Sequence, residues 1–158
     1  MSITVRFARE GDENKIAELL VAIHRQHAEG RPDLFGGGNA KLSAGEVKAL
    51  FHRPDTPFFV AVSEDGEVVG YLLSMVTQSP TPVHRPYTSL YIDDLNVDAS
   101  ARRLGVGSAL LDACRKHAKA IGCYNLTLNV WAFNTSAIAF YEKNGFFTQR
   151  SYLESPLD

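Results

Sequence analysis

The chain has 158 residues, 45% of them hydrophobic and 22% charged, which fits one globular domain and leaves no room for a second core of comparable size. Its formal net charge of −2 argues against a nucleic-acid partner, because phosphate binding over a broad surface needs a clustered excess of lysine and arginine. The sequence has no signal peptide and no apolar stretch long enough to span a bilayer, so we expect a cytoplasmic protein without a membrane partner. Its two cysteines, Cys114 and Cys123, give neither a disulfide framework nor zinc-ligand spacing.

Hydrophobic periodicity and turn residues predict six strands and four helices. In chain order these are a strand over 4–9, a helix from Asp12, a loop over 29–39, a helix over 43–52, strands over 58–63 and 67–76, a loop over 77–86, a strand over 90–97, a helix over 106–121, a strand over 124–131, a helix over 135–144 and a strand over 146–153. Ser43 and Glu46 have the spacing of a capping box, and Glu64-Asp65-Gly66 is a hairpin signal. Antiparallel hairpins followed by a β-α-β crossover predict an α/β fold.

The segment over 95–108 carries the most information about function. A strand ends there, a short loop follows, and a long amphipathic helix opens with Gly105 and Gly107. The free backbone N–H groups and the dipole of a helix N-terminus bind phosphate, and glycines let a ligand approach the backbone closely. Arg102 and Arg103 add positive charge beside the turn, which therefore predicts a pyrophosphate site.

Two familiar nucleotide-binding motifs fit this turn less well. A Walker A loop needs Gly-Lys-Ser/Thr, which is absent, and a dinucleotide fingerprint needs a third glycine at position 110, which is Leu. The two glycines could merely shape a tight turn, but the Arg102-x-x-Gly105-x-Gly107 spacing before a long helix makes that alternative less attractive.

A second segment follows the next predicted strand and has the pattern Asn134-x-x-Ala137-x-x-Phe140-Tyr141-Glu142-x-x-Gly145-Phe146. Together with the glycine turn it resembles, in the same order, two successive motifs of the GNAT superfamily of N-acetyltransferases. The resemblance covers about residues 60–150 well. It implies one N-acetyltransferase domain over 1–158, with a coenzyme-binding core at about 90–146 and acceptor-side helices and loop at about 12–57. The implied α/β fold is a mixed, mostly antiparallel sheet of six or seven strands flanked by about four helices.

The resemblance also implies acetyl-CoA as cosubstrate and assigns residues to it. Pantetheine is expected to fill the gap between two splayed strands, and pyrophosphate to lie on the glycine turn. The implied coenzyme-binding residues are Leu95, Asn96, Val97, Arg102, Arg103, Leu104, Gly105, Val106, Gly107, Ser108, Asn134, Ala137 and Tyr141. The chain departs from the family at Ala99, Ala101 and Arg103, where proline, an aromatic residue and glycine usually shape the loop.

Tyr141, Asp93 and Asp94 are the candidate catalytic residues. Acyl transfer expels a thiolate that the Tyr141 phenol could protonate. A lone tyrosine on such a helix would be read as a core residue, but its place in this motif favours the role of acid. An amine acceptor arrives protonated, with a pKa of ~10, and must lose a proton. Asp93 and Asp94 lie mid-strand, where alternation sends them to opposite faces unless a bulge intervenes. A local resemblance to polyamine N-acetyltransferases implies Asp93 as the base and Asp94 as a supporting group; a structural role for the pair, or a water chain as base, stays open.

The acceptor is expected to be a primary amine, with a cationic small amine or polyamine favoured over a peptide or protein amine. The candidate acceptor-binding residues are His27, Asp33, Phe35 and Tyr87. His24 and His27 lie one helical turn apart, but no third ligand has suitable spacing, so no metal is expected. Family members often dimerise through their later strands, which makes a homodimer a further expectation.

Two other functions stay open. A non-catalytic acyl-CoA-binding sensory domain would keep the glycine turn and lose the chemistry, and the presence of Tyr141 and the acidic pair disfavours it. An unrelated nucleotide-binding domain would bind ATP or NAD instead of CoA. The preferred hypothesis is direct transfer of acetyl from acetyl-CoA to the amine, without an acyl-enzyme, since neither cysteine belongs to a recognisable nucleophile–base arrangement.

Overall fold

A five-stranded mixed sheet organises the computed structural model, which describes residues 2–36 and 41–157. The strands are β1 (Ile3–Phe7), β2 (Phe58–Ser63), β3 (Val68–Gln78), β4 (Thr88–Val97) and β5 (Asn125–Leu128). The helices are α1 (Glu13–Gly30), α2 (Ala44–Leu50), α3 (Val106–Ala120) and α4 (Thr135–Lys143), with a 3₁₀ turn, η1 (Ala99–Ala101), before α3. The strands lie in sequence order; β1 to β4 are antiparallel neighbours, and β5 runs parallel to β4. The predicted α/β fold is confirmed.

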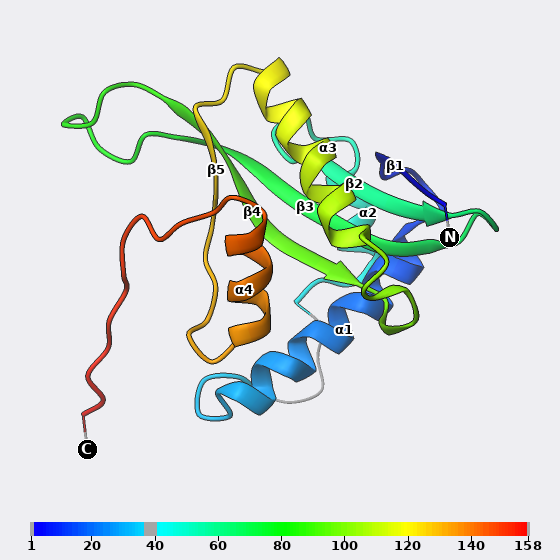
Figure 1. Ribbon diagram of the computed structural model, residues 1–158, viewed down its shortest axis with the longest axis horizontal. Helices are drawn as coiled ribbons and strands as arrows, with labels where there is room; N and C mark the ends of the chain where they lie inside the picture. The colour runs from blue at the N-terminus through cyan, green and yellow to red at the C-terminus, as the bar shows by residue number, and fades with distance from the viewer. Residues whose placement is uncertain (1, 37–40, 158) are drawn as a thin grey trace.

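Helices cover both faces of the sheet (Figure 1). α3 packs on one face, where its Leu110 and Leu111 are fully buried in a cluster with residues of β2, β3 and β4. α1 and α2 pack on the other face, where Ile16 and Val47 are fully buried against residues of β2 and β3.

Short sequence motifs explain where several of the helices and strands begin or end. Ser43 accepts a hydrogen bond from the Glu46 backbone N–H while Glu46 accepts one from the Ser43 N–H, which is the predicted capping box. Gly66 takes a φ of 82° in the hairpin between β2 and β3. Asp12 occupies the N-cap position of α1, but its carboxylate accepts from Arg6 (2.8 Å) instead of capping the helix.

The strand predicted over 146–153 is absent from the described structure, so the sheet has five strands where six or seven were expected. Residues 146–157 form a segment without regular structure, in which Phe147 and Tyr152 are 87% and 102% exposed. Alternating apolar residues give a segment the tendency to form a strand, but a strand also needs a neighbouring edge for its backbone hydrogen bonds. This segment turns away from the sheet beyond α4 and does not pair with the edge strand β5 (Figure 1).

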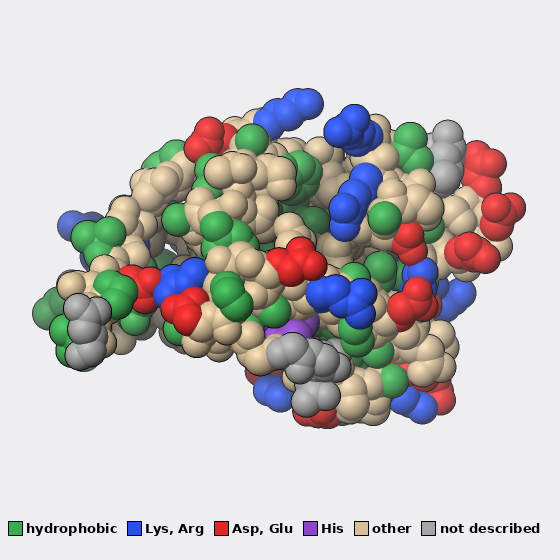
Figure 2. Space-filling view, turned by 90° about the horizontal axis from the view of Figure 1, so that it is seen from below, with side chains coloured by type: hydrophobic (Ala, Val, Ile, Leu, Met, Phe, Trp, Pro, Cys, Tyr) green, Lys and Arg blue, Asp and Glu red, His purple; other side chains and the backbone are tan. Residues whose placement is uncertain are grey.

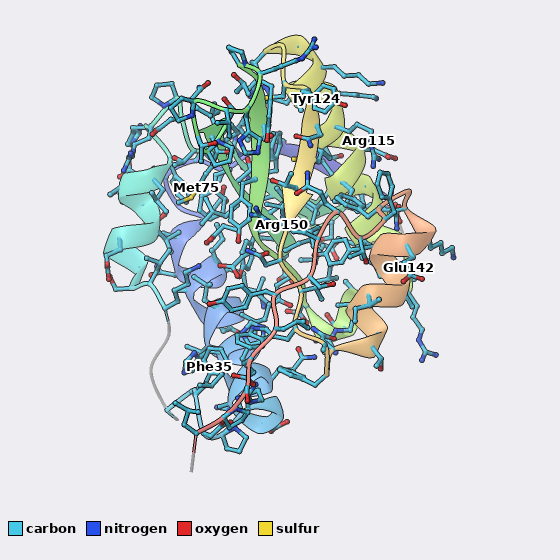
Figure 3. All side chains as sticks on the ribbon, turned by 90° about the vertical axis from the view of Figure 1, so that its left-hand side faces the viewer. Phe35, Met75, Arg115, Tyr124, Glu142 and Arg150 are labelled. Carbon is cyan, nitrogen blue, oxygen red and sulfur yellow. The ribbon has the colours of Figure 1, made fainter. Side chains whose placement is uncertain are left out.

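An ion pair ties the later part of the C-terminal segment to the end of α1. Figure 3 shows this segment, marked by Arg150, descending from α4 towards the end of α1, where Arg31 donates to Glu154 (2.5 Å). Acidic and basic side chains are interspersed over the face of the molecule seen in Figure 2. None of the helices in the described ranges combines the length and the apolar character needed to cross a bilayer.

Candidate active site

β4 and β5 separate after a short parallel stretch, which opens a gap in the sheet. Their pairing ends at Ile92 and Leu128, where β5 stops, whereas β4 continues to Val97. The β4 backbone over 93–97 therefore has β3 on one side and, within the described part of the chain, no strand on the other. This is the splayed geometry that the family resemblance implied, and it leaves backbone groups of β4 facing a cavity.

A β-bulge in β4 brings both aspartates to that cavity. Leu73 pairs with Asp94 and Ser74 pairs with Ile92, so Asp93 is the extra residue that has no partner on β3. The bulge breaks the alternation that would otherwise send neighbouring side chains to opposite faces. Both carboxylates line a cavity of about 690 Å³, and the side chains of Asp93 and Asp94 are only 16% and 10% exposed.

Lys41 supplies a cation to the two carboxylates. Its Nζ lies 2.5 Å from Oδ2 of Asp93 and 3.6 Å from Oδ2 of Asp94. Burial raises the pKa of Asp94 to about 6; the Lys41 charge opposes this shift and the Asp93 charge adds to it. Burial lowers the pKa of Lys41, but its hydrogen bond to Asp93 and the two carboxylate charges outweigh that effect and raise the pKa overall. Lys41 is therefore an ammonium at neutral pH, and Asp94 is the carboxyl that titrates close to neutrality.

Two tyrosines approach this carboxylate pair from other elements. Tyr141, on α4, lines the cavity, and burial together with the Asp94 charge raises its pKa to about 12. Tyr71, on β3, is fully buried, and burial and the charges of Asp94 and Asp93 raise the pKa of its phenol. Neither the Tyr71 hydroxyl nor Oδ2 of Asp94 has a hydrogen-bond partner among the described residues. Unsatisfied buried polar atoms of this kind are rare and mark a place where a ligand or water completes the hydrogen bonding.

A second cavity, of about 400 Å³, lies over the N-terminus of α3. Gly105 occupies the N-cap position with a φ of 79°, and no side chain caps the first turn of the helix. A Cβ built on Gly105 would meet nothing within 4 Å, so it would project into open space. Arg102, Arg103 and Lys143 line the same cavity. A helix N-terminus without a cap, surrounded by three cations, fits the charge and size of a pyrophosphate.

The two cavities adjoin at Leu95, which lines both. Of the implied coenzyme-binding residues, those that line either cavity are Leu95, Val97, Arg102, Arg103, Gly105, Val106, Gly107, Ser108, Asn134, Ala137 and Tyr141. Asn96 and Leu104 line neither. The Asn96 amide donates instead to the Leu19 carbonyl (2.7 Å), which ties β4 to α1, and Leu104 is 46% exposed.

Three residues of the glycine turn, Arg103, Gly105 and Gly107, each meet a different structural constraint. Arg103 has a φ of 65°, in the left-handed region that favours glycine, at the position where the family often has glycine. A Cβ built on Gly107 would lie 2.8 Å from Cζ of Phe140, a contact that real Cβ atoms do not make. Gly105 therefore supplies a backbone angle, whereas Gly107 supplies the space that lets α4 pack against α3.

Aromatic side chains line the end of the larger cavity near α1. The Phe35 ring, labelled in Figure 3, lies with its centroid 5.5 Å from that of His27 and 5.4 Å from that of Trp131. Burial and the charges of His24 and Lys41 lower the pKa of His27, which favours a neutral imidazole at pH 7. Within the described ranges, no three His, Cys, Asp or Glu side chains are grouped closely enough to hold a metal ion.

The structure does not bring the predicted acceptor residues Asp33 and Tyr87 into this cavity. Asp33 is exposed and pairs with Arg31 (2.8 Å). Tyr87 precedes β4, at the end of the strand remote from Asp94, where its ring packs against Tyr124 at 5.8 Å. Both residues belong to irregular segments, whose position in space no periodicity of the sequence fixes.

Sequence reasoning missed Lys41 and Tyr71. Lys41 reaches Asp93 across 52 positions in the chain, from a segment without a predicted element, so no local pattern could indicate the contact. Tyr71 did carry a signal, because its hydroxyl interrupts an otherwise apolar stretch of a buried strand. A phenol in that setting needs a partner, and such a need predicts a polar site nearby.

Comparison with known proteins agrees with this geometry. The pattern of the Acetyltransferase (GNAT) family matches residues 20–146. A peptidyl-lysine N-acetyltransferase, YjaB, of Salmonella typhimurium is 30% identical over 146 residues, which cover 92% of this chain and 84% of that protein. An N-alpha-acetyltransferase of Sulfurisphaera tokodaii is 38% identical over 102 residues, covering 58% of this chain and 57% of that protein.

Solved structures share the fold. A mutant of the BH1408 protein from Bacillus halodurans superposes with a TM-score of 0.92 at 28% identity, covering 98% of this chain and 99% of that one. An aminoglycoside acetyltransferase, meta-AAC0020, from an uncultured soil metagenomic sample superposes with a TM-score of 0.72 at 20% identity, covering 99% and 97% of the two chains. The family pattern extends over most of the sequence, and the Salmonella relative aligns with nearly all of it; the chain belongs to the GNAT family of acetyltransferases.

Proposed function

We propose that this protein transfers an acetyl group from acetyl-CoA to a primary amine by direct attack within a ternary complex. One observation carries the proposal: the cavity where β4 and β5 separate joins a buried carboxylate pair, Asp93 and Asp94, with the Tyr141 phenol. The cavity over the α3 N-terminus adjoins it at Leu95, so an extended ligand with phosphates at one end and a thioester at the other fits the pair of cavities.

α3 and the turn before it bind the phosphates. The first backbone N–H groups of α3, together with Arg102 and Arg103, hold the pyrophosphate. The unpaired backbone of β4 over 93–97 binds the pantetheine arm as an added strand would, through N–H and C=O groups that have no β5 partner. Members of this family generally use acetyl-CoA, which agrees with this division of the site.

The reaction also needs two proton transfers, which side chains carry out. Asp94 takes a proton from the attacking ammonium, directly or through one water, because its pKa of about 6 makes it a stronger base than an ordinary aspartate. We therefore prefer Asp94 over Asp93 for this role, the reverse of the assignment implied by the local resemblance to polyamine N-acetyltransferases. Tyr141 keeps its proton at neutral pH and donates it to the leaving thiolate. Backbone N–H groups of β4, such as that of Leu95, stabilise the oxyanion of the tetrahedral intermediate.

Cysteine chemistry does not compete with this mechanism. Cys114 is fully buried, and burial raises the pKa of its thiol to about 12, so it holds no thiolate near neutral pH. Cys123 is partly buried, and burial raises its pKa as well. A thiol must ionise to attack a thioester, so burial makes both thiols poorer nucleophiles, and neither cysteine lines either cavity. The acetyl group therefore passes directly to the amine.

The acceptor we propose is a primary alkylammonium. The carboxylate pair selects for positive charge, and the neighbouring Phe35 and Trp131 rings suit an alkyl chain or a cation. A lysine side chain and a polyamine both satisfy these requirements, and the Salmonella relative is a peptidyl-lysine N-acetyltransferase. The test is a panel of spermidine, a lysine-containing peptide, a peptide with a free N-terminus but no lysine, and an aminoglycoside, with release of the CoA thiol as readout. Thiol release on any amine supports acetyl transfer, whereas acetyl-CoA binding without thiol release on any of them supports the sensory alternative.

We also propose that two copies of the chain associate through the C-terminal segment. Phe147, Tyr152 and Leu153 are 87%, 102% and 87% exposed, and β5 lies at the edge of the described sheet. An extended segment with exposed apolar side chains and a free strand edge together favour strand addition between copies. Light scattering on the full chain tests this: we expect twice the chain mass, and a monomer after Phe147→Glu with Tyr152→Glu. A monomeric parent protein would contradict the proposal.

A further inference from the structure

Lys41 occupies the position that an acceptor amine needs. It is the one lysine among the described residues that line the larger cavity, and its ammonium lies against both aspartates, 2.5 Å from Asp93 and 3.6 Å from Asp94. An alkylammonium held by this carboxylate pair, in a cavity that Tyr141 also lines, has the same chemistry as the substrate proposed above. Lys41 therefore resembles a bound acceptor that happens to be part of the chain.

We propose that Lys41 is itself acetylated by this site, in an intramolecular reaction that precedes the acetylation of external amines. The inference rests on the proposed acetyl-CoA-dependent function. Its geometric basis is the direct contact between Nζ of Lys41 and Oδ2 of Asp93, together with the shared cavity. Half of the Lys41 side chain is exposed (51%), so the residue is not locked in the core.

The reaction balances with groups already described. The Lys41 ammonium loses one proton to Asp94, which passes it to water, and the neutral amine attacks the thioester carbon. A C–N bond forms, the C–S bond breaks, and the second proton of the former ammonium ends on the CoA sulfur by way of the Tyr141 hydroxyl. The products are Nε-acetyl-Lys41 and CoA. Acetyl-CoA is the only co-reactant, and no oxidant or reductant is needed.

Acetylation changes the site in a defined way. The amide of acetyl-lysine carries no charge, so the ion pairs from Lys41 to Asp93 and Asp94 are lost. The carboxylate pair then lacks its internal cation and is free to bind the ammonium of an external amine. The charge of Lys41 also lowers the pKa of Asp94, so acetylation leaves Asp94 a stronger base than before. Self-acetylation would therefore open the acceptor site and strengthen its base.

Peptide mapping by mass spectrometry tests the proposal. The full chain is incubated with acetyl-CoA alone, and the acetylated fraction of Lys41 is followed over time beside Lys48, an exposed-surface reference that pairs with Glu10. Because Lys41 is held in the cavity, we expect it to react at least about tenfold faster than Lys48. The rate per molecule should not depend on protein concentration, and Tyr141→Phe should slow it.

Two variants keep the result interpretable. Lys41→Arg preserves a positive charge for the two aspartates and should show no fast acetylation. Lys41→Gln imitates the acetylated state, and we expect it to acetylate an external amine without the initial delay of the parent protein. Acetylation of Lys41 no faster than that of Lys48 would overturn the inference. If thiol release with an external amine persists in that case, the proposed function stands while the inference fails; if acetyl-CoA does not bind at all, both fail together.

Discussion

Replacing Asp94 with asparagine should remove the base while preserving the shape of the site. The groups that face this carboxyl come from four parts of the chain: Asp93 beside it on β4, Lys41 from the segment before α2, Tyr71 from β3 and Tyr141 from α4. Asparagine keeps the side-chain volume but cannot accept a proton. We expect kcat/KM for the amine to fall by about 10²–10⁴-fold, the usual contribution of a general base.

The structure gives a magnitude for the effect of burial on this base. Proton transfer from an amine with a pKa of ~10 to a carboxyl with an ordinary pKa of ~3.9 has an equilibrium constant of about 10⁻⁶. Burial raises the pKa of Asp94 to about 6, which improves that constant to about 10⁻⁴, a gain of about 100-fold. Below pH 6 the carboxyl is protonated, so kcat/KM should fall by about tenfold for each further pH unit.

The assay is thiol release from acetyl-CoA as a function of pH, with Asp93→Asn as the matched control. Asp93 lies on the same strand, and its carboxylate contacts the same lysine. We expect kcat/KM to fall below about pH 6, the acidic limb of the pH profile, in the parent protein and in Asp93→Asn. Asp94→Asn should show no such limb. Loss of the limb in Asp93→Asn alone would move the base to Asp93, and a limb unchanged in both variants would indicate a water chain.

Substitutions at three further positions, two of them with controls elsewhere, test other parts of the site. Tyr141→Phe should lower turnover by at least about tenfold with little change in acetyl-CoA affinity, whereas Tyr124→Phe, on an exposed ring, should change neither; unchanged turnover would remove Tyr141 from the role of acid. Arg103→Gly and Arg103→Ala both remove a phosphate-binding charge and should weaken acetyl-CoA binding to the same extent. Because glycine relieves the strain of the left-handed φ of 65°, urea unfolding should show Arg103→Gly to be more stable than Arg103→Ala by about 1 kcal/mol. Equal stabilities of the two variants would contradict this backbone strain. Gly107→Ala should destabilise the protein by about 1–3 kcal/mol and slow turnover, because the new Cβ displaces the Phe140 ring next to Tyr141. Adding Phe140→Leu to this variant should recover part of the lost stability.

A pH-dependent stability prediction concerns Asp98, which holds the turn before α3. Its carboxylate accepts from Lys15 (2.6 Å) and from the Ser100 backbone N–H (3.0 Å), and these hydrogen bonds lower its pKa to about 2. A depressed folded-state pKa means that the stabilisation is complete above the unfolded value of ~3.9 and is lost as the pH falls towards 2. Asp98→Asn should therefore lower Tm at pH 7 and make little difference at pH 2. An equal loss at both pH values would show that the ionised carboxylate is not responsible.

The parts of the site that local sequence predicted are those built by short motifs. The glycine turn could be predicted because a helix N-terminus, two glycines and adjacent arginines lie within a few residues of one another. Asp93 and Asp94 could be singled out because carboxylates are unusual in a strand. Which face each one takes depended on a bulge, and the register against β3 that creates the bulge is a property of two strands together.

The missed features all depend on contacts between distant parts of the chain. Lys41 has no predicted element around it, and only the fold brings it to Asp93. Tyr87 and Asp33 were chosen from loops, and the chain carries both away from the cavity. The strand predicted over 146–153 has the right alternation, but in the described chain it does not pair with the edge strand β5. Propensity describes what a segment can form, and the partner decides whether it does.

Calorimetric titration with acetyl-CoA, CoA, ATP and NAD tests the central claim most directly. We expect acetyl-CoA and CoA to bind, with ATP and NAD much weaker, because the gap beside β4 accepts pantetheine and the α3 N-terminus accepts only the pyrophosphate. Arg103→Ala should weaken the CoA signal, and addition of a reactive amine to the acetyl-CoA complex should release thiol. Binding of ATP or NAD in preference to CoA, or no binding of CoA at all, would contradict the proposed function.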